Sequence, residues 1–392
     1  MEQLGELVDV KVMDFDGVVA LAERAHADLV IVGPEDPLSA GITDRLTAAG
    51  FRVFGPTAAA ARLEGSKDFA NQLMANAGIA TSSSQTFDDP DAAKHYVRDC
   101  AYQVVIKADG LAAGKGVTVC NDTTEAEAAI DRIMVDRAFG DAGVRIVVEE
   151  RMYGPEVSAH AFTDGVTIRH MPFSCDHKPV FDGNIGPNTG GMGAYSPPGW
   201  LDDSTAEAIR TDVTERAVRA MADSGNLYSG VIYPGMMVTA NGPRVIEFNG
   251  RFGDPETEVL LPKLRTDLLE ICDAVADGRL SEVPVEWDDV ATVGVIMASG
   301  GYPDAYETGK PISGLDSIDE DVQVFIAGAK RDAEGRIVTS GGRVLCVVGR
   351  GASMDEARTR AYDNVARISF EGAHYRTDIG ATADQPLEAI AR

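Results

Sequence analysis

The sequence has little positive charge, and lysine is especially scarce. Its 392 residues include 35 lysines and arginines against 62 aspartates and glutamates, which gives a formal net charge of −27. Only nine of these basic residues are lysines. A chain this acidic repels phosphate backbones, so nucleic acid is not expected among its partners. An acidic, lysine-poor surface also predicts a protein adapted to a high-salt cytoplasm, where screening tolerates the self-repulsion.

Paired cysteines, long apolar runs and a leader-like start are also missing. The five cysteines form no Cys-x-x-Cys pair and are odd in number, which argues against disulfides or structural zinc and predicts buried or reduced thiols. Hydrophobic residues make up 44% of the chain, but no run approaches the length of a membrane span. The acidic start does not resemble a secretory signal. We expect a cytoplasmic protein of two or three domains without membrane contact.

The chain does contain a stretch rich in glycine and lysine between two β-branched runs, 104–106 and 117–119. Its glycines and lysines are Gly110, Gly114, Gly116, Lys107 and Lys115. The pattern predicts a hairpin with a mobile, cationic tip. Such a tip suits a polyphosphate, because glycine lets backbone N–H groups approach phosphate oxygens and lysine supplies point charges. It is not a Walker loop, which needs wider glycine spacing and a following helix. A flexible hairpin with solvated lysines is the alternative.

The opening residues predict one βαβ unit. We expect a helix over 17–27, a strand over 28–32, a helix over 38–49 and a strand over 51–54, and each strand is followed by Gly-Pro. Ligands usually bind at the carboxyl ends of such strands, although Gly-Pro turns also merely end strands.

Residues 57–77 predict two short helices, of which the second has Ser66 as N-cap and stops at Gly78. Lys67 then lies at a helix start, where a cation is unfavourable unless an anionic partner binds there. A solvated lysine fits this pattern equally well.

A smaller unit should follow, with helices over 90–99 and 123–139 and strands over 104–107, 116–119 and 144–150. The last of these strands ends in Glu149 and Glu150, and a half-buried strand is expected over 156–162. Residues 170–199 are rich in glycine and proline and predict a long ordered loop of the functional kind, with a linker as the alternative.

The third part of the chain predicts a helix over 204–224, a strand over 230–238 and a strand ending at Asn249. Glu247 and Asn249 leave the same face of that strand, as oxygen ligands of a hard cation do. Charged pairs on exposed strands are also common. Strands over 292–298 and 343–348 and a helix over 354–368 predict a C-terminal α+β unit.

Together these stretches resemble the ATP-grasp superfamily and, within it, the phosphoribosylamine–glycine ligase family. The motifs that carry the resemblance are Val32–Glu35, Leu63–Lys67, Val105–Gly116, Asp176–Lys178, Gly186–Pro197, Val245–Asn249, Arg251–Glu256 and Gly341–Leu345. The resemblance implies an α/β and α+β multidomain chain with an ATP-grasp fold. The implied domains are an incomplete, doubly wound N-terminal substrate domain (1–62), an ATP-grasp domain (63–290, small nucleotide lobe about 84–160) and a C-terminal α+β domain (291–392).

The resemblance also implies a reaction, in which ATP drives the joining of glycine to 5-phosphoribosylamine through glycyl phosphate, in purine biosynthesis. It implies Mg2+ or Mn2+ and a monomer. The implied ATP-binding residues are Lys67, Lys107, Gly110, Gly114, Lys115, Gly116, Glu149, Glu150 and Glu156. The implied substrate-binding residues are Gly33, Pro34, Glu35, Asp176, Gly190, Gly191, Met192 and Gly193. Lys178, Arg251 and Asp254 would be catalytic, and Glu247 and Asn249 would bind the metal.

The chain departs from the family pattern at its start and at Cys175, Pro179 and Gly250, and two of these departures bear on substrate binding. It lacks the family's opening strand and the Gly-x-Gly-Gly-Arg-Glu-His loop that holds the ribosylamine phosphate, so an opening segment of roughly 30 or more residues is expected to be missing. Pro179 stands where the family has arginine, which removes one substrate-side cation. Two alternatives therefore stay open: another ATP-grasp carboxylate–amine ligase, and a truncated protein that binds nucleotide without turnover.

Overall fold

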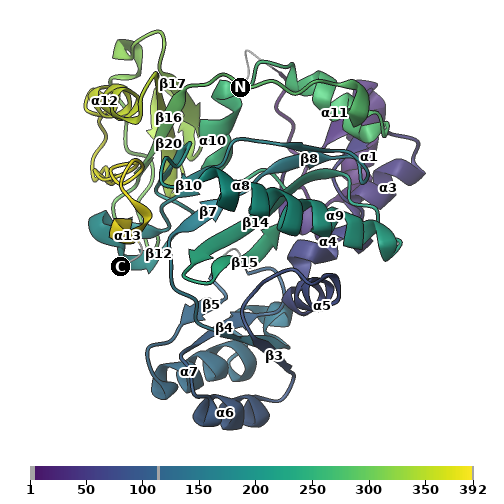
Figure 1. Ribbon diagram of the computed structural model, residues 1–392. Coiled ribbons are helices and arrows are strands. Elements are labelled where there is room, and N and C mark those ends of the chain that lie inside the picture. Colours follow the sequence, from purple (N-terminus) through teal and green to yellow (C-terminus); the bar gives the residue numbers. More distant parts are fainter. Residues whose placement is uncertain (1–4, 113–114, 391–392) are drawn as a thin grey trace.

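The computed structural model describes residues 5–112 and 115–390. Figure 1 shows a broad body from which a small lobe projects at the bottom. The N-terminal helices lie at the right of the body and the C-terminal sheet with its helix at the upper left. The small lobe comes from a single stretch of chain, as the sequence predicts.

The N-terminal unit is built on two short parallel strands, β1 (Val30–Ile31) and β2 (Val53–Phe54). This parallel pairing confirms the predicted βαβ unit. Its helices are α1 (Phe15–Ala25), α2 (Glu35–Ser39) and α3 (Ile42–Ala48). The single helix predicted over 38–49 was wrong, because Gly41, with a φ of 94°, separates α2 from α3.

Two helices connect this unit to the rest of the body. They are α4 (Ala58–Gly65) and α5 (Lys67–Ala77), and the break between them lies where the sequence predicts it. The Ser66 hydroxyl accepts a hydrogen bond from the Phe69 N–H and so caps α5, and Gly78 ends α5 in the left-handed conformation.

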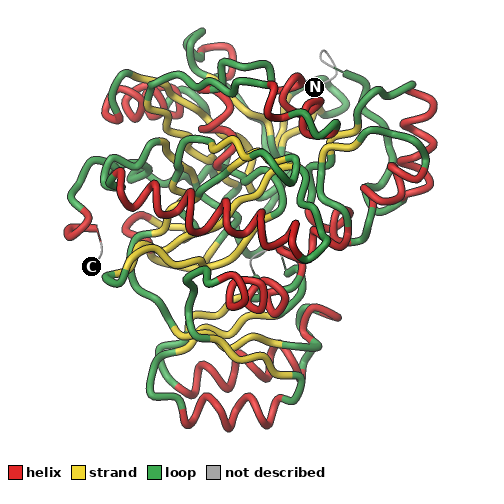
Figure 2. The backbone as a smooth tube through the Cα atoms, turned by 45° about the vertical axis from the view of Figure 1, so that its right-hand side comes forward, coloured by secondary structure: helices red, strands yellow, loops and turns green. Residues whose placement is uncertain are grey.

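The small lobe is a four-stranded antiparallel sheet covered on its outer face by helices (Figures 1 and 2). Its strand order is β3 (Ser84–Phe87), β6 (Ile146–Glu150), β4 (Val104–Ala108) and β5 (Val117–Val119). The outer helices are α6 (Pro90–Asp99) and α7 (Thr123–Ile130), the latter extended by a π-helical turn over Asp131–Val135. The antiparallel pairing of β4 with β5 confirms the predicted hairpin. The helix predicted to reach Phe139 ends at Val135.

The sheet of the central body faces the small lobe. Its order is β15 (Gly242–Asn249), β14 (Gly230–Thr239), β8 (Ala161–Thr163) and β9 (Ile168–His170), with β7 (Glu156–Ser158) also paired to β14. A long helical run crosses the sheet in Figure 2 and consists of α8 (Asp203–Ala208), a π-helical segment (Ile209–Glu215) and α9 (Arg216–Asp223). The shorter helices α10 (Glu256–Leu260) and α11 (Leu268–Ala276) follow β15.

A second five-stranded sheet carries the C-terminal residues. Its order is β10 (Cys175–Asp176), β13 (Gly193–Ser196), β16 (Ala291–Ala298), β20 (Arg343–Gly351) and β17 (Gln323–Ile326), and α12 (Met354–Val365) packs on it. The remaining elements are the hairpins β11 (Pro179–Phe181) with β12 (Ile185–Asn188) and β18 (Ala329–Arg331) with β19 (Ile337–Thr339), and α13 (Leu387–Ile390). The prediction of one long loop over 170–199 was thus wrong. Two strands of this stretch, β10 and β13, join the sheet that the C-terminal residues build.

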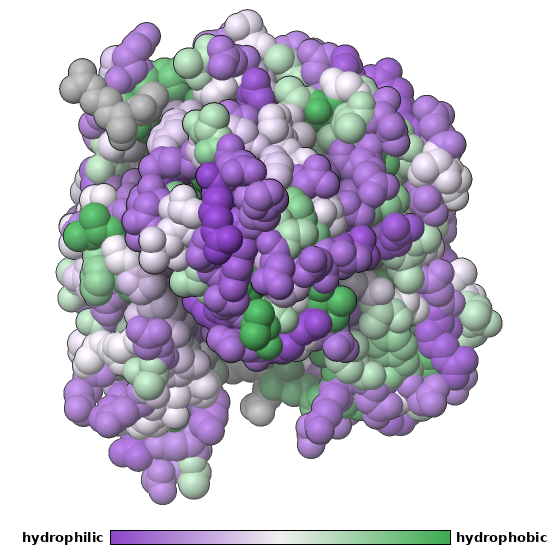
Figure 3. All heavy atoms as spheres, turned by 90° about the horizontal axis from the view of Figure 1, so that it is seen from below, coloured by the Kyte–Doolittle hydropathy of each residue, from purple (hydrophilic) through white to green (hydrophobic). Residues whose placement is uncertain are grey.

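The five cysteines are free thiols, and four of them are buried, as the sequence predicts. Within the described ranges, no helix is both long and apolar enough to cross a membrane. The face seen in Figure 3, from below, is mostly hydrophilic.

Candidate active site

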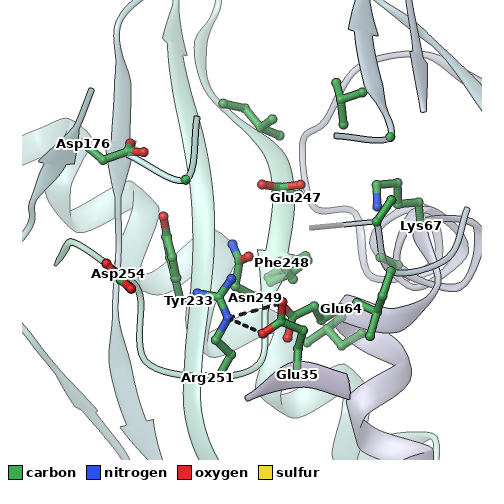
Figure 4. Close-up of a pocket in the computed structure, with 18 of the residues that line it drawn as sticks. Glu35, Glu64, Lys67, Asp176, Tyr233, Glu247, Phe248, Asn249, Arg251 and Asp254 are labelled. Carbon is green, nitrogen blue, oxygen red and sulfur yellow. Dashed lines mark ion pairs between the residues drawn. The ribbon is translucent and has the colours of Figure 1, made fainter. Parts of the chain in front are cut away.

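A cavity of about 530 Å³ lies between the small lobe and the body. All parts of the fold contribute to its wall: the loop after β1, helices α4 and α5, the hairpin of the small lobe, strand β15 and the start of β20. Figure 4 shows acidic and basic side chains from these elements pointing into one space.

The side of the cavity under the small lobe combines a helix start with the lobe's hairpin. Lys67 is the first residue of α5, and Ala108, Gly116 and Val117 line the cavity opposite it. Asp109 fixes this arrangement, because its Oδ1 accepts hydrogen bonds from the Asp68 N–H (2.8 Å) and the Ser66 hydroxyl (3.2 Å). A helix N-terminus with a lysine favours an anion, and phosphate fits this chemistry.

Lys107 and Glu149 form a buried ion pair beside this wall. The Lys107 Nζ lies 2.8 Å from the Glu149 Oε2, and the two side chains are 4% and 6% exposed. The same ammonium donates to the carbonyl of Ile246 at 2.9 Å. Lys107 therefore links the small lobe to β15 of the body, which the resemblance did not imply.

Glu247 and Asn249 extend from β15 into the middle of the cavity (Figure 4). Burial raises the pKa of Glu247, but the charges of Lys67, Lys107, Lys178 and Arg251 outweigh it and lower the pKa below its ordinary value. The side chain is therefore an anion. An ionised carboxylate and an amide oxygen two residues apart on a strand suit a hard divalent cation. In the described parts of the chain, no three His, Cys, Asp or Glu side chains form a metal-binding group.

Arg251 lies between the N-terminal unit and β15. Its Nε is 3.3 Å from the Glu35 Oε2 and 3.7 Å from the Glu64 Oε1, as the dashed lines in Figure 4 mark. Glu64 also accepts a hydrogen bond from the Gly250 N–H at 2.8 Å. Burial raises the pKa of Glu64 to about 7 although Arg251 opposes it. Sequence reasoning missed Glu64, whose position inside the Leu63–Lys67 motif was its only signal.

Asp176 and Lys178 stand at the end of the cavity away from Lys67. The Lys178 Nζ lies 3.0 Å from the Glu156 Oε2 and 3.6 Å from the Asp176 Oδ2. Burial raises the pKa of Asp176 to about 7, with Lys178 opposing the shift. The pKa of Lys178 stands well above its usual value, because Asp176 and Glu156 outweigh the opposing effect of burial.

A buried polar cluster supports this end of the cavity from behind. The Tyr233 hydroxyl donates to the Glu256 carboxylate, and Ser158 lies within 3.0 Å of that hydroxyl. The ring of His160 stacks on Tyr233 at 3.9 Å, and burial lowers its pKa to about 3, so His160 is neutral. No local sequence signal marks this cluster, since its members are spread over β7, the residue before β8, β14 and α10.

Asp254 and Gly190 are held by Arg343 at the same end. The Arg343 Nη2 lies 2.8 Å from the Asp254 Oδ2, and its Nη1 donates to the Gly190 carbonyl at 2.8 Å. Arg343 itself lines the cavity. Its motif, Gly341–Leu345, was part of the resemblance, but no site role was predicted for it.

Most residues assigned to the site from the sequence do line the cavity. They are Gly33, Pro34, Glu35, Lys67, Gly116, Glu149, Asp176, Lys178, Gly190, Glu247, Asn249, Arg251 and Asp254. Lys107 and Glu156 reach it through their ion pairs with Glu149 and Lys178. Six other predicted site residues are described by the structure but do not line the cavity: Gly110, Lys115, Glu150, Gly191, Met192 and Gly193. Gly114 lies outside the described residues.

Packing explains three of these exceptions. A Cβ on Gly110 would lie 2.8 Å from the Ala142 Cα, so this glycine lets the hairpin approach the turn before β6. Gly191, with a φ of 109°, would place a Cβ 2.4 Å from Pro255. Met192 is fully buried behind Gly190.

The two-lobed fold and the charged cavity between the lobes are those of an ATP-grasp protein. Biotin carboxylase from Campylobacter jejuni shares the fold, with a TM-score of 0.73 at 18% identity over 95% of this chain and 82% of that one. Family models of phosphoribosylglycinamide synthetase match the N domain at residues 1–64, the ATP-grasp domain at 65–257 and the C domain at 292–382. The chain belongs to this family.

Named relatives agree with this assignment. Phosphoribosylamine–glycine ligase from Rhodopirellula baltica is 48% identical over 385 residues, which cover 96% of this chain and 88% of the relative. The ligase of Yersinia pestis is 46% identical and covers 98% and 90%. The crystal structure of the Thermotoga maritima ligase has a TM-score of 0.77 at 35% identity and covers 83% of this chain and 81% of that one.

Proposed function

We propose that this protein is an ATP-dependent ligase that joins glycine to 5-phosphoribosylamine and yields glycinamide ribonucleotide, ADP and phosphate. The observation that carries the proposal is the single cavity in which Lys67, Glu247 and Asn249 face the same space as Asp176, Lys178 and Arg343. One end suits a polyphosphate and the other suits a zwitterion and an amine. The family membership supports the same reaction.

In the first step, a carboxylate oxygen of glycine attacks the γ-phosphorus, the bond to the β-phosphate oxygen breaks, and ADP leaves. This chain's part is to position and neutralise anions, because phosphoryl transfer needs no protein nucleophile. Lys67 and Lys107 would hold phosphate oxygens. Arg251 is suited to the glycine carboxylate, since a guanidinium presents paired donors to a planar anion.

In the second step, the amine nitrogen of phosphoribosylamine attacks the carbonyl carbon of glycyl phosphate, and phosphate leaves as the amide bond forms. The attacking nitrogen must lose a proton. Asp176 is suited to accept it, because burial raises the pKa of this carboxyl to about 7 and brings it near the working pH. Lys178 beside it would neutralise the departing phosphate.

The donor set of Glu247 and Asn249 fits a divalent cation, and we propose Mg2+, with Mn2+ as a substitute. When bound, such a cation neutralises phosphate charge and orients the nucleotide. We further propose that the site residues act within the domains expected from the sequence and that the working unit is a monomer in the cytoplasm.

The test is ADP release with ATP, Mg2+ and glycine, with and without freshly made phosphoribosylamine, at low and molar KCl. We expect sustained release only when glycine and the amine are both present. ADP release at the same rate with and without phosphoribosylamine would indicate another carboxylate–amine ligase. ATP binding without any turnover at either salt concentration would indicate a nucleotide-binding protein and overturn the proposal.

A further inference from the structure

Arg343 comes from the first residue of β20, in the C-terminal part of the chain, yet its guanidinium forms part of the cavity wall. Its side chain is 20% exposed and makes four polar contacts with two loops. The Nη1 donates to the carbonyls of Gly190 (2.8 Å), Asp254 (3.3 Å) and Gly191 (3.4 Å), and the Nη2 lies 2.8 Å from the Asp254 Oδ2. One planar cation thus fastens the loop before β13 to the loop after β15.

The loop that Arg343 holds is connected in turn to Lys178. The Thr189 hydroxyl donates to the Lys178 carbonyl at 2.8 Å and accepts from the Gly191 N–H at 2.9 Å. From the other side, the Gly190 N–H donates to the hydroxyl of Tyr302, which lies just after β16. The backbone that carries Lys178 is therefore fixed by residues of the C-terminal part.

The glycine at position 190 is what lets the guanidinium lie against this loop. A Cβ there would be 3.1 Å from the Arg343 Cζ and 3.3 Å from its Nη2. A Cβ at position 190 would press on the guanidinium and shift it by a few tenths of an ångström. This glycine therefore leaves room for the guanidinium of Arg343 against the loop.

We propose that Arg343 is a positioning residue for the substrate end of the cavity, where it holds Asp254 and the Lys178 loop in place for glycine and the amine. This inference rests on the proposed function. Within the described ranges, no hydrogen bond or ion pair joins Arg343 to Lys67, Glu247 or Asn249. We therefore expect the nucleotide end of the cavity not to depend on Arg343, so that an experiment can distinguish effects on ATP binding from effects on substrate binding.

Arg343→Lys is the first variant, because it keeps the charge but cannot make four contacts in two directions. Hydrogen bonds to charged groups contribute about 1.5–3 kcal/mol, so we expect kcat/KM for phosphoribosylamine and for glycine to fall roughly 10- to 150-fold. The Kd of ATP, measured by titration calorimetry, should change by less than about twofold.

Gly190→Ala is the second variant, since its Cβ would shift the guanidinium by a few tenths of an ångström and leave its charge intact. We expect kcat/KM for the amine to fall, by less than in Arg343→Lys, and ATP binding to be retained. The matched control is Arg350→Ala, on the same strand, where a half-buried arginine pairs with Asp288 at 2.7 Å, away from the residues that line the cavity; its kinetics should equal those of the wild type.

Three results would overturn either the proposed function or the positioning role of Arg343. Absence of turnover by the wild type would overturn the proposed function. Wild-type turnover with unchanged kcat/KM in Arg343→Lys and Gly190→Ala would overturn the positioning role alone. Equal losses of ATP binding and of turnover in both variants would show a purely structural role and would overturn it as well.

Discussion

Replacing Lys107 with methionine should destabilise the small lobe by about 3–5 kcal/mol. Among the described residues, Lys107 is the cation that pairs with the Glu149 carboxylate, so the variant leaves that carboxylate buried and unpaired. Breaking a buried pair by removing one partner is costly because the charge left behind is uncompensated, whereas replacing both partners removes that charge.

The assay is amide hydrogen exchange along a urea series at one fixed pH, followed on β4 and β6. Exchange reports the opening of the small lobe separately, which matters because a chain of several domains need not unfold in one step. We expect Lys107→Met to lower the free energy of opening by about 3–5 kcal/mol. Adding Glu149→Gln should restore most of the loss, because it removes the stranded charge.

The matched control is Arg98→Met in the same lobe, which breaks the pair of Arg98 with Glu127, two side chains 55% and 31% exposed. Exposed pairs contribute about 0–1 kcal/mol, so this variant should change little. A cost for Lys107→Met no larger than that for Arg98→Met, or no recovery in the double variant, would refute the reasoning.

Three further predictions concern pH and salt. The pH profile of kcat/KM should rise through about pH 7 as Asp176 loses its proton, and Asp176→Asn should remove this limb; an unchanged limb would rule out Asp176 as the base. Because burial raises the pKa of Glu64 to about 7, the folded state keeps a proton that the unfolded state releases, so stability should fall as pH rises from about 5 to 7. Glu64→Gln should flatten that fall in urea midpoints, and parallel curves would contradict it. With a net charge of −27, the thermal midpoint should rise from low to molar KCl, and a flat or falling series would show that self-repulsion is unimportant.

Local patterns predicted the elements that are stabilised within a short stretch of chain. The hairpin of β4 and β5 followed from its β-branched runs and glycines, and the break between α4 and α5 followed from Gly65 and the cap at Ser66. Placing Glu247 and Asn249 on one face needed only the two-residue period of a strand. These features depend on neighbours in sequence, which a single sequence displays directly.

The contacts that complete the site join residues that are far apart in the sequence. Arg343 meets Asp254 across 89 residues, and Glu64 accepts from Gly250 across 186. In neither contact do the neighbouring residues in sequence indicate the partner, because a charged side chain that forms a distant contact has the same sequence signature as one that is solvated. Strands such as β10 and β13 were missed because two or four residues are too few for an alternating pattern.

The second five-stranded sheet has a consequence for how this enzyme could be divided or recombined. Asp176 belongs to β10, and β13 joins that strand to β16, so a side chain of the candidate site rests on the sheet that the last hundred or so residues build. The C-terminal part is therefore not an exchangeable module. A chimera that takes residues 291–392 from a relative would pair foreign strands with native β13, whereas one that also takes 175–196 would transfer the sheet whole.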